Sequence, residues 1–322
     1  MPDHDDRWKA MLFEGPELIP VGVGILPAAW KEHGEKLEAI CARHPAIFGD
    51  VRVGERDYDQ MATSYREGRH VDPWGYVWEN LCEGMESYVV EHNCPTRADV
   101  HTLKAPEGDH GTPHGFMFMR LYYLRGFEEL MIDFAEEPPE LQRLIDVVLD
   151  YNMSQIETFI EQHGPGERLQ HFGDDMGMQT SLPISPATWR NYMKPCFARM
   201  FGRCHEIGWY VYLHSDGHIW EVIPDLAECG VNVINPQIRA NGLDNLVAVC
   251  KGRICVNLDL DRQLFPFATP AELDAHIREA VEKLGSPAGG LWLSAEIGPD
   301  VPLDNVEAIC TALERYRGYY SS

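Results

Sequence analysis

Short apolar runs alternate with amphipathic segments through the second half of this chain. The runs at 168–173, 209–213 and 231–234 have the length and the residue types of buried strands, whereas segments such as 269–284 have the spacing of a helix. From residue 168 onward, strand and helix alternate five times without an interruption. This order predicts an α/β fold with a parallel sheet and helical crossovers, and at 322 residues a (β/α)8 TIM barrel.

The earlier part of the chain is less regular. No linker, repeat or low-complexity segment divides it from the rest, so we expect a single domain over residues 1–322. A doubly wound open sheet is the structural alternative, but no G-x-G-x-x-G motif follows an early strand. Before residue 168 we expect strands at 18–26, 51–57 and 116–124, a strand or hairpin at 70–80, and helices at 27–42, 125–134 and 141–163.

Polar side chains follow the ends of the predicted strands, which is where barrels carry out chemistry. The clearest case is His214, which ends an apolar run and is followed by Ser215, Asp216 and Gly217. Residues at i and i+2 of a strand point to the same side, so the imidazole and the Asp216 carboxylate would face one cavity. We predict an active site at this turn. The full set of strand-end residues is Asp174, Asp175, His214, Asp216, Asn235, Gln237, Asn257, Asp259 and Glu296.

The same residues also have structural interpretations. Ser215 or Asp216 would cap the following helix, and His214 would then be a buried, hydrogen-bonded histidine. Asp174 and Asp175 would belong to a capped loop, because adjacent side chains face one cavity only where the backbone turns. A further alternative is a metal-free His–Asp pair that acts as an acid and a base.

A second group of candidates lies at 70–80, where the turn Asp72-Pro73-Trp74-Gly75 opens onto Trp78. The two indoles would form a stacking floor for a flat ligand, or an aromatic cluster packed under a loop. Arg120 would bind a carboxylate or form an ion pair with one of the many acidic residues. The substrate-binding candidates are therefore Asp72, Trp74, Trp78, Arg120, Gln179, Asn235, Gln237, Asn257 and Asp259.

The charge of the chain narrows the range of partners. There are 27 Lys and Arg residues against 51 Asp and Glu residues, which gives a formal net charge of −24. Such a chain repels phosphate backbones and anionic membrane surfaces, so we expect neither nucleic acid nor a membrane as a partner. A small-molecule substrate fits this composition better.

Cysteine use and hydropathy indicate a cytoplasmic protein. No run of 18 apolar residues is present, and the first residues are polar and acidic rather than those of a signal peptide. The nine cysteines are scattered, with no C-x-x-C motif. We expect reduced thiols, most of them in the core.

Seven motifs occur in order along the chain. They are Val71-Asp72-Pro73-Trp74-Gly75, Leu124-Arg125-Gly126-Phe127-Glu128, Asp174-Asp175-Met176-Gly177-Met178-Gln179, Ile184-Ser185-Pro186, His214-Ser215-Asp216-Gly217, and the segments 230–237 and 299–305. Together they resemble the uroporphyrinogen decarboxylase superfamily, which includes zinc-dependent corrinoid methyltransferases. The resemblance implies a (β/α)8 barrel with 70–322 as the family-matching region and 1–69 as an N-terminal extension.

The resemblance also shows where this chain departs from its relatives. The decarboxylases carry an N-terminal R-Q-A-G-R stretch that holds substrate carboxylates, but the first 60 residues here have only scattered arginines. The methyltransferases bind zinc through H-x-C and a later Cys. The corresponding positions here are His214-Ser215-Asp216 and Glu296, which implies zinc held by His214, Asp216 and Glu296, with carboxylates in place of sulfur.

Oxygen ligands make zinc a harder Lewis acid, better suited to polarise an ether oxygen than to activate a thiol. We therefore predict a methyltransferase that moves a methyl group from a small methoxy compound to a corrinoid held by a partner protein. Asp174, Asp175, His214 and Glu296 are its predicted catalytic residues. A carboxy-lyase or another metal-free lyase on the same barrel, and a barrel that only binds a ligand, are the alternatives. Self-association as a homodimer is a further expectation.

Overall fold

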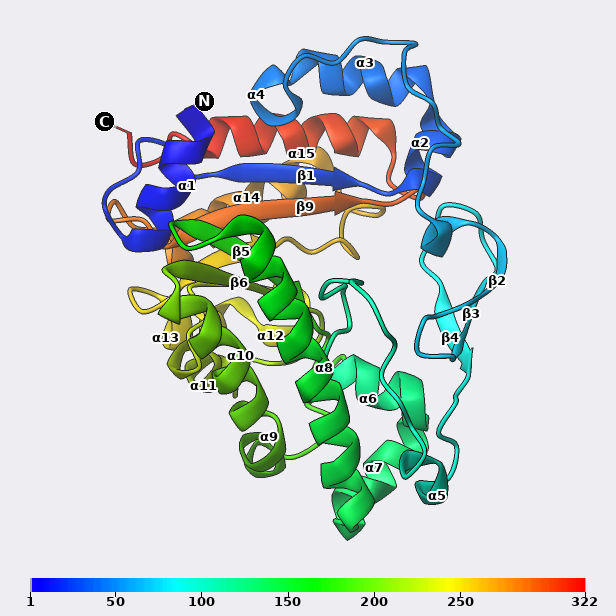
Figure 1. Cartoon of the computed structure of the whole chain (residues 1–322). Helices are drawn as coiled ribbons and strands as arrows, with labels where there is room; N and C mark the ends of the chain where they lie inside the picture. Colours follow the sequence, from blue (N-terminus) through cyan, green and yellow to red (C-terminus); the bar gives the residue numbers. More distant parts are fainter. Residues whose placement is uncertain (1, 322) are drawn as a thin grey trace. The chain divides into compact units, whose positions relative to one another are not determined.

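The structure is a computed structural model that describes residues 2–321 (Figure 1). Its backbone contacts divide the chain into two compact units, which are described separately. Unit 1 consists of Met1–Gly68, Asn80–Ser87 and Pro236–Ser322, and unit 2 consists of Arg69–Glu79 and Tyr88–Asn235.

Unit 1 is built on three parallel strands in the order β1 (Val21–Ile25), β9 (Leu291–Ile297) and β8 (Cys255–Asp259). The pairing of β1 with β9 places Gly24 opposite Glu296. The region predicted as an N-terminal extension therefore supplies one strand of this sheet. The helix predicted at 27–42 is divided at Gly34, whose φ of +53° favours glycine.

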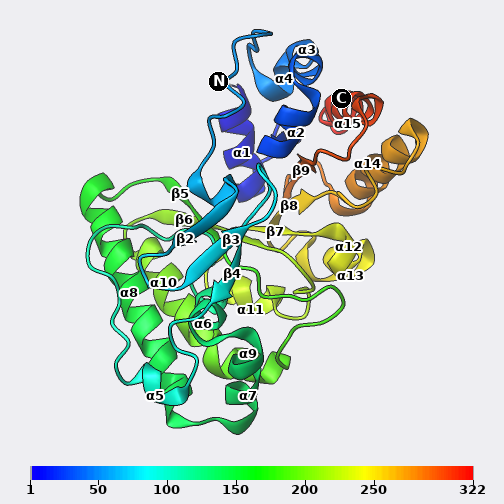
Figure 2. The ribbon, with the colours of Figure 1, turned by 90° about the vertical axis from the view of Figure 1, so that its right-hand side faces the viewer.

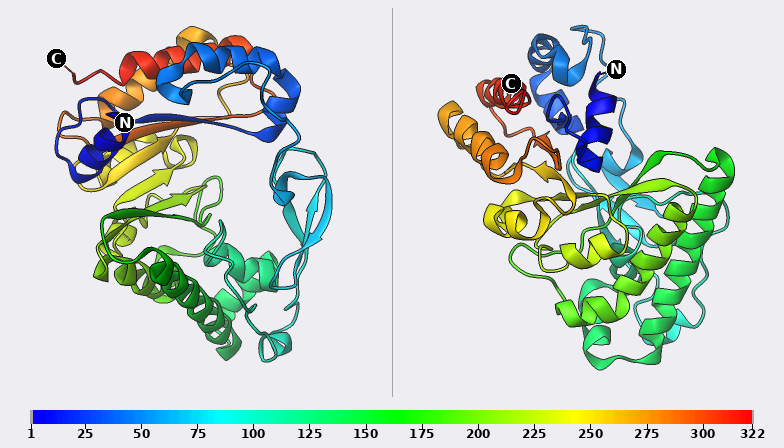
Figure 3. Two further views of the ribbon diagram at one scale, coloured as in Figure 1. Left: turned by 45° about the horizontal axis from the view of Figure 1, so that its top comes forward. Right: turned by 90° about the vertical axis from the view of Figure 1, so that its left-hand side faces the viewer.

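Helices of unit 1 pack beside this sheet, and Figure 3 shows the red α15 next to the blue α3. Thr269, at the start of the predicted helix 269–284, is the N-cap residue of α14, and its side chain forms a capping box with Glu272. The helices are α1 (Pro2–Leu12), α2 (Pro27–His33), α3 (Glu35–Arg43), α4 (Pro45–Phe48), α12 (Ile238–Asn241), α13 (Leu243–Cys250), α14 (Pro270–Leu284) and α15 (Leu303–Tyr316).

Unit 2 holds the parallel pair β5 (Arg168–Gly173) and β6 (Trp209–Ser215), with β7 (Val233–Pro236) next to β6. Burial alternates along β6, because Trp209, Val211 and Leu213 pack against the helices while His214 faces the other side of the sheet. In the core between sheet and helices, Phe172 of β5 contacts Phe201 with ring centroids 5.2 Å apart.

A small sheet, β2 (Gly68–Val71), β3 (Val77–Asn80) and β4 (Tyr88–Glu91), accompanies these strands, and β3 and β4 are antiparallel (Figure 2). The hairpin expected at 70–80 is thus present. The helices of unit 2 are α5 (Arg97–Val100), α6 (Phe118–Arg125), α7 (Phe127–Glu136), α8 (Pro139–His163), α9 (Pro186–Tyr192), α10 (Lys194–Glu206) and α11 (Ile223–Glu228).

The α/β class and the strands from residue 168 onward are confirmed, but three expectations are wrong. The segment 116–124 forms most of helix α6 instead of a strand, and 51–57 contains no strand. The turn after β6 does not cap a helix, because α11 begins only at Ile223. Within residues 2–321 the larger sheet has six strands rather than the eight of a TIM barrel, so the closed barrel stays a prediction. No helix of this range combines the length and the apolar content needed to cross a membrane.

Candidate functional site

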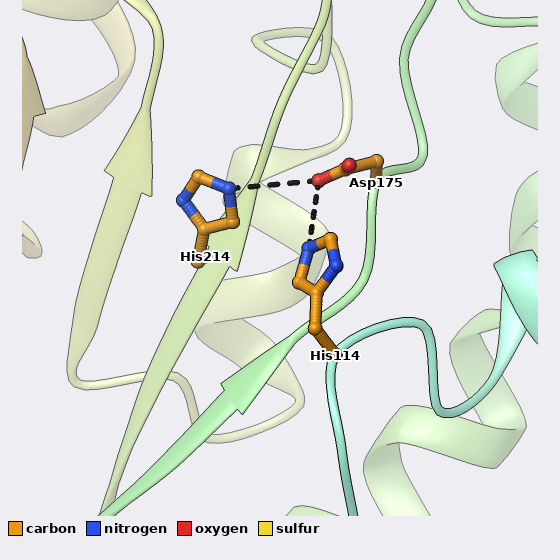
Figure 4. Close-up of side chains that lie close together, drawn as sticks. All are labelled: His114, Asp175 and His214. Atoms are coloured by element: carbon orange, nitrogen blue, oxygen red, sulfur yellow. Dashed lines mark hydrogen bonds and ion pairs between the residues drawn. The ribbon is translucent and has the colours of Figure 1, made fainter. Parts of the chain in front are cut away.

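Three side chains of unit 2 meet at the carboxyl ends of β5 and β6 (Figure 4). His114 Nε2 lies 3.2 Å from Asp175 Oδ1, and His214 Nε2 lies 3.6 Å from the same oxygen. Their ligand atoms all lie within 4.8 Å of one another. Within residues 2–321 this is the one group of three or more His, Cys, Asp or Glu side chains gathered closely enough to hold a metal ion.

His114 reaches the site from a loop, and a glycine makes its approach possible. The N–H of Gly115 donates to the carbonyl of Gly173 at 2.7 Å, which ties the loop to the end of β5. A Cβ at Gly173 would lie only 2.4 Å from Cδ2 of the His114 ring. Any larger residue at that position would push the imidazole away from the site.

The two loops that carry Asp175 and Asp216 are fixed to each other by their backbones. A Cβ on Gly217 would lie 2.2 Å from the Gly177 carbonyl oxygen, so the backbones of these two loops are in close contact. The N–H of Gly177 donates to the Asp216 carbonyl, and the N–H of Asp216 donates to Asp175 Oδ1 at 2.8 Å. The Asp175 carboxylate is thereby held in place.

Asp174 and Asp175 point in different directions. The Asp174 side chain is fully buried and accepts hydrogen bonds from the N–H groups of Phe118 and Met119, at 2.6 and 3.0 Å. These are free donors at the start of α6, so the carboxylate caps that helix. Burial raises the pKa of Asp174 to about 6, although the two N–H groups act in the opposite direction. Its contacts are those of a positioning residue.

His214 is held on both sides of its ring. Nδ1 lies 2.7 Å from Asn235 Oδ1, and Nε2 lies 3.3 Å from Asp216 Oδ1. Because the Asn235 oxygen only accepts, Nδ1 carries a proton and Nε2 faces the carboxylates. Burial opposes the charged form, but the hydrogen bond and charge of Asp216, with the charge of Asp175, raise the pKa of His214 to about 9.

The pKa values of the other two side chains of the site are also shifted in the direction that favours their charged forms. Burial opposes the charge of His114, but its hydrogen bond to Asp175 raises its pKa. Burial likewise opposes the charge of Asp175, but His114 and His214 lower its pKa. Without a metal, the group is therefore an ion-paired set of imidazoles and carboxylates.

The donor set fits zinc. Two imidazole nitrogens and one carboxylate oxygen, with an open position, are a common catalytic zinc set. Zinc bonds to such atoms are about 2.0–2.2 Å long, so ligands of a tetrahedral site lie about 3.3 Å apart. The separations of 3.2 and 3.6 Å around Asp175 Oδ1 match that spacing.

Several predicted site residues belong to unit 1. Glu296 pairs with Arg262 Nη1 at 2.5 Å, and Arg262 also contacts Asp259 at 3.2 Å. Glu296 lines a cavity of about 730 Å³ in that unit. The residues Gln237, Asn257 and Asp259 lie on or beside β8. The zinc set of His214, Asp216 and Glu296 stays a prediction.

The residues predicted at 70–80 form mainly an aromatic cluster. Trp74 and Tyr76 are buried, and Asp72 accepts hydrogen bonds from the Trp74 backbone N–H at 2.9 Å and from Trp78 Nε1 at 3.4 Å. Arg120 Nη1 donates to the Tyr76 hydroxyl at 2.6 Å. The buried Trp74 ring offers no stacking floor, because side chains already cover it.

Trp78 is only half-buried, and Gln179 is exposed on the loop that also carries Asp175. These two residues remain candidates for contact with a substrate. His114, in contrast, was missed by sequence reasoning, because it follows no predicted strand. The only local signal is its place between two glycines in Gly111-Thr112-Pro113-His114-Gly115.

Comparison with known proteins gives the family. The model of the uroporphyrinogen decarboxylase (URO-D) family matches residues 116–316. The chain belongs to the URO-D family. This match includes Asp175 and His214 and begins two residues after His114. The resemblance stated from the motifs is confirmed.

Comparison of this URO-D family member with solved structures gives two matches of different quality. A methyltransferase from Methanosarcina mazei has a TM-score of 0.61 and 17% sequence identity, over 96% of this chain and 98% of that one. A dihydropteroate synthase from Xanthomonas albilineans, solved with 4-aminobenzoic acid, has a TM-score of 0.34 and 16% identity, over 50% of this chain and 58% of that one. The first likeness shows a shared fold, and the second is too low to indicate one. No curated protein matches the chain.

Proposed function

We propose that this URO-D family member is a methyltransferase that takes the methyl group of a small methoxy compound and passes it to a corrinoid on a partner protein. Zinc would be held by His114, Asp175 and His214. The observation that carries the proposal is the meeting of these three side chains. The methyltransferase of Methanosarcina mazei, which has a similar fold, supports the class of reaction. A closed barrel, a homodimer and a cytoplasmic location belong to the same proposal.

The chemistry follows from the donor atoms. Bound zinc supplies a Lewis acid that withdraws electrons from the ether oxygen and so weakens its bond to the methyl carbon. Nitrogen and oxygen ligands suit this task, whereas thiolates would make the metal softer. Asn235 keeps one proton of His214 on Nδ1, so that Nε2, which faces the carboxylates, would bind the metal after losing its own proton.

Asp216 is placed to manage the proton of the reaction. Its carboxylate lies 3.3 Å from His214 Nε2 and is the nearer of the two carboxylates to that nitrogen. It would accept the proton that Nε2 loses, and return a proton to the oxygen that remains after the methyl group has left. The two products are then the alcohol, which carries the proton, and the corrinoid, which carries the methyl group.

The proposal is tested by measuring the zinc content of the protein and by following the visible absorption spectrum of the corrinoid. Protein purified without chelator is expected to contain one zinc per chain, and a panel of methoxy compounds should include one that converts cob(I)alamin to methylcobalamin. His114→Gln and His214→Gln should lose both properties. Glu296→Gln is the matched control, because its partner Arg262 lies in unit 1. Zinc that is retained in His114→Gln but lost in Glu296→Gln would show that the set predicted from the sequence is the right one. A spectrum unchanged by every donor would refute methyl transfer.

A carboxy-lyase is the second candidate, and the URO-D match favours it. The hydrogen-bonded pair of His114 and Asp175 could exchange protons without a metal. Metal-free protein that releases carbon dioxide from a carboxylate substrate would support this function and contradict the first.

A further inference from the structure

A cavity of about 220 Å³ lies within unit 2, and none of the three residues of the candidate metal site lines it. Helix α8 contributes Gln155, Ile156 and Phe159 to its wall, and β6 contributes Trp209. The segment Gly111–Pro113 closes one side. His114 follows this segment directly in the sequence, so the cavity wall and the metal site share one stretch of backbone.

The lining of the cavity selects for an uncharged ligand. It contains no Lys, Arg, Asp or Glu, and His171 is the one imidazole among its residues, although the chain as a whole has a formal net charge of −24. A charged ligand would lose its hydration and find no charged side chain in the lining itself, because the nearby Arg168 guanidinium is engaged with the Phe159 and Trp209 rings, 4.7 and 5.5 Å from their centroids. The polar groups that are present include the amides of Gln155 and Gln170. Gln155 Nε2 already donates to the Gly108 carbonyl at 3.1 Å, so its second N–H and the Gln170 amide are the groups that offer hydrogen bonds to a neutral ligand.

The shape and size indicate an aromatic molecule. The rings of Phe159 and Trp209 meet edge to face, with centroids 5.7 Å apart and an interplanar angle of 83°. Benzene fills an apolar cavity of about 150 Å³, so a cavity of about 220 Å³ has room for a benzene ring with a few additional heavy atoms. Indole and substituted phenols have this size.

We propose that this cavity binds a small uncharged aromatic molecule that carries a hydrogen-bonding group, and that its occupancy changes the metal affinity of the site containing His114. The binding is independent of the proposed methyl transfer. The coupling rests on the metal site of the proposed function.

The coupling has a structural route. Gln155 lines the cavity, and its Oε1 accepts hydrogen bonds from the N–H groups of His110 and Gly111, at 2.7 and 3.0 Å. The other end of the segment is tied to β5 by the bond from the Gly115 N–H to the Gly173 carbonyl. A ligand that binds the Gln155 amide or packs against residues 111–113 therefore acts on the backbone that positions the His114 ring.

Binding is tested with indole on the full-length, metal-free protein. Isothermal titration should show one indole per chain, and benzoate should bind at least tenfold more weakly because it is charged. Ile156→Phe fills the cavity and should weaken indole at least tenfold. Ile160→Phe is the matched control on the same helix, since Ile160 does not line the cavity, and it should stay within twofold of wild type. If Ile156→Phe does not fold, Cys204→Leu narrows the same cavity from α10.

Two results would overturn the site: indole that does not bind at millimolar concentration, or indole that binds Ile156→Phe as well as wild type. Coupling is measured by zinc titration with and without saturating indole. A change of about fivefold or more in zinc affinity is expected, and zinc must then change the indole affinity by the same factor. A zinc affinity that stays within twofold would overturn the coupling. Because indole binding is measured without zinc or corrinoid, its outcome is separate from that of the methyl-transfer assay.

Discussion

Gly173 gives the sharpest test of the candidate metal site, because alanine at this position would act almost entirely through His114. The added Cβ would lie 2.4 Å from the His114 ring, whereas ordinary contacts of a Cβ begin at 3.4 Å. The ring must therefore retreat by about 1 Å, the difference between these distances. His114 is on an exposed loop and can make this movement without disrupting the core. The Gly173 φ is not in the left-handed region, so alanine brings no backbone strain.

A retreat of this size is enough to impair metal binding. Zinc ligands must sit within about 0.2 Å of their ideal distance, so a ring displaced by about 1 Å no longer binds well. Loss of ligand orientation typically weakens metal binding by about 10–100-fold. We expect Gly173→Ala to lower zinc affinity by a factor in this range. The change corresponds to about 1.4–2.7 kcal/mol of binding free energy.

Zinc affinity would be measured on metal-free protein by competition with a chromophoric chelator, and folding by circular dichroism and urea unfolding. Gly22→Ala is the matched control, since Gly22 is also a strand glycine and its added Cβ would meet nothing within 4 Å. A Gly173→Ala protein that folds normally and binds zinc as tightly as Gly22→Ala would refute the role of His114 as a ligand.

Three further predictions concern the groups around the site. Asn235→Leu removes the acceptor of His214 Nδ1 and should weaken zinc binding about 10–100-fold, whereas Asn235→Asp should retain it, as measured by the same competition assay. Asp174→Ala leaves two buried N–H donors of α6 without an acceptor and should lower the free energy of unfolding by about 1–3 kcal/mol in urea, with Asp174→Asn less affected. Zinc affinity should rise with pH, because the proton on His214, with its raised pKa of about 9, must leave before the metal binds. About 1% of this imidazole is neutral at pH 7 and about half at pH 9, so this proton alone should raise the affinity about 50-fold over that range in chelator competition. The proton on His114, whose pKa is also raised, makes the rise steeper.

The strands after residue 168 could be predicted because each is a short apolar run between two helical patterns. The segment 116–124 shows where this reasoning fails. Helix α6 is buried on nearly all sides, so its sequence has no polar face and reads like a buried strand. The carboxylate that caps this helix belongs to Asp174, which lies more than 50 residues later in the chain. A contact of that range leaves no local signal.

The candidate site also contains residues that could be predicted from the sequence and one that could not. Asp175, Asp216 and His214 could be predicted, because strand ends of a parallel sheet place their side chains at one edge. His114 could not, because a loop brings it to Asp175 across 61 positions of the sequence. The resemblance to zinc methyltransferases indicated Glu296 as a ligand position, and that assignment stays a prediction.

The charges around His214 provide a further argument for a divalent cation. The pKa values of His114 and His214 are both raised, and two carboxylates, those of Asp175 and Asp216, lie beside them. With both imidazoles protonated, the charges of the four side chains sum to zero. When one dication replaces the two protons, the sum is again zero, so the site can change its occupant without leaving an unpaired charge in a half-buried position. A single monovalent cation in place of both protons would leave an excess negative charge. At a pH at which both imidazoles are protonated, the number of protons released per metal therefore distinguishes the two ligand sets: two for a dication bound by both imidazoles, and one if only His214 is a ligand.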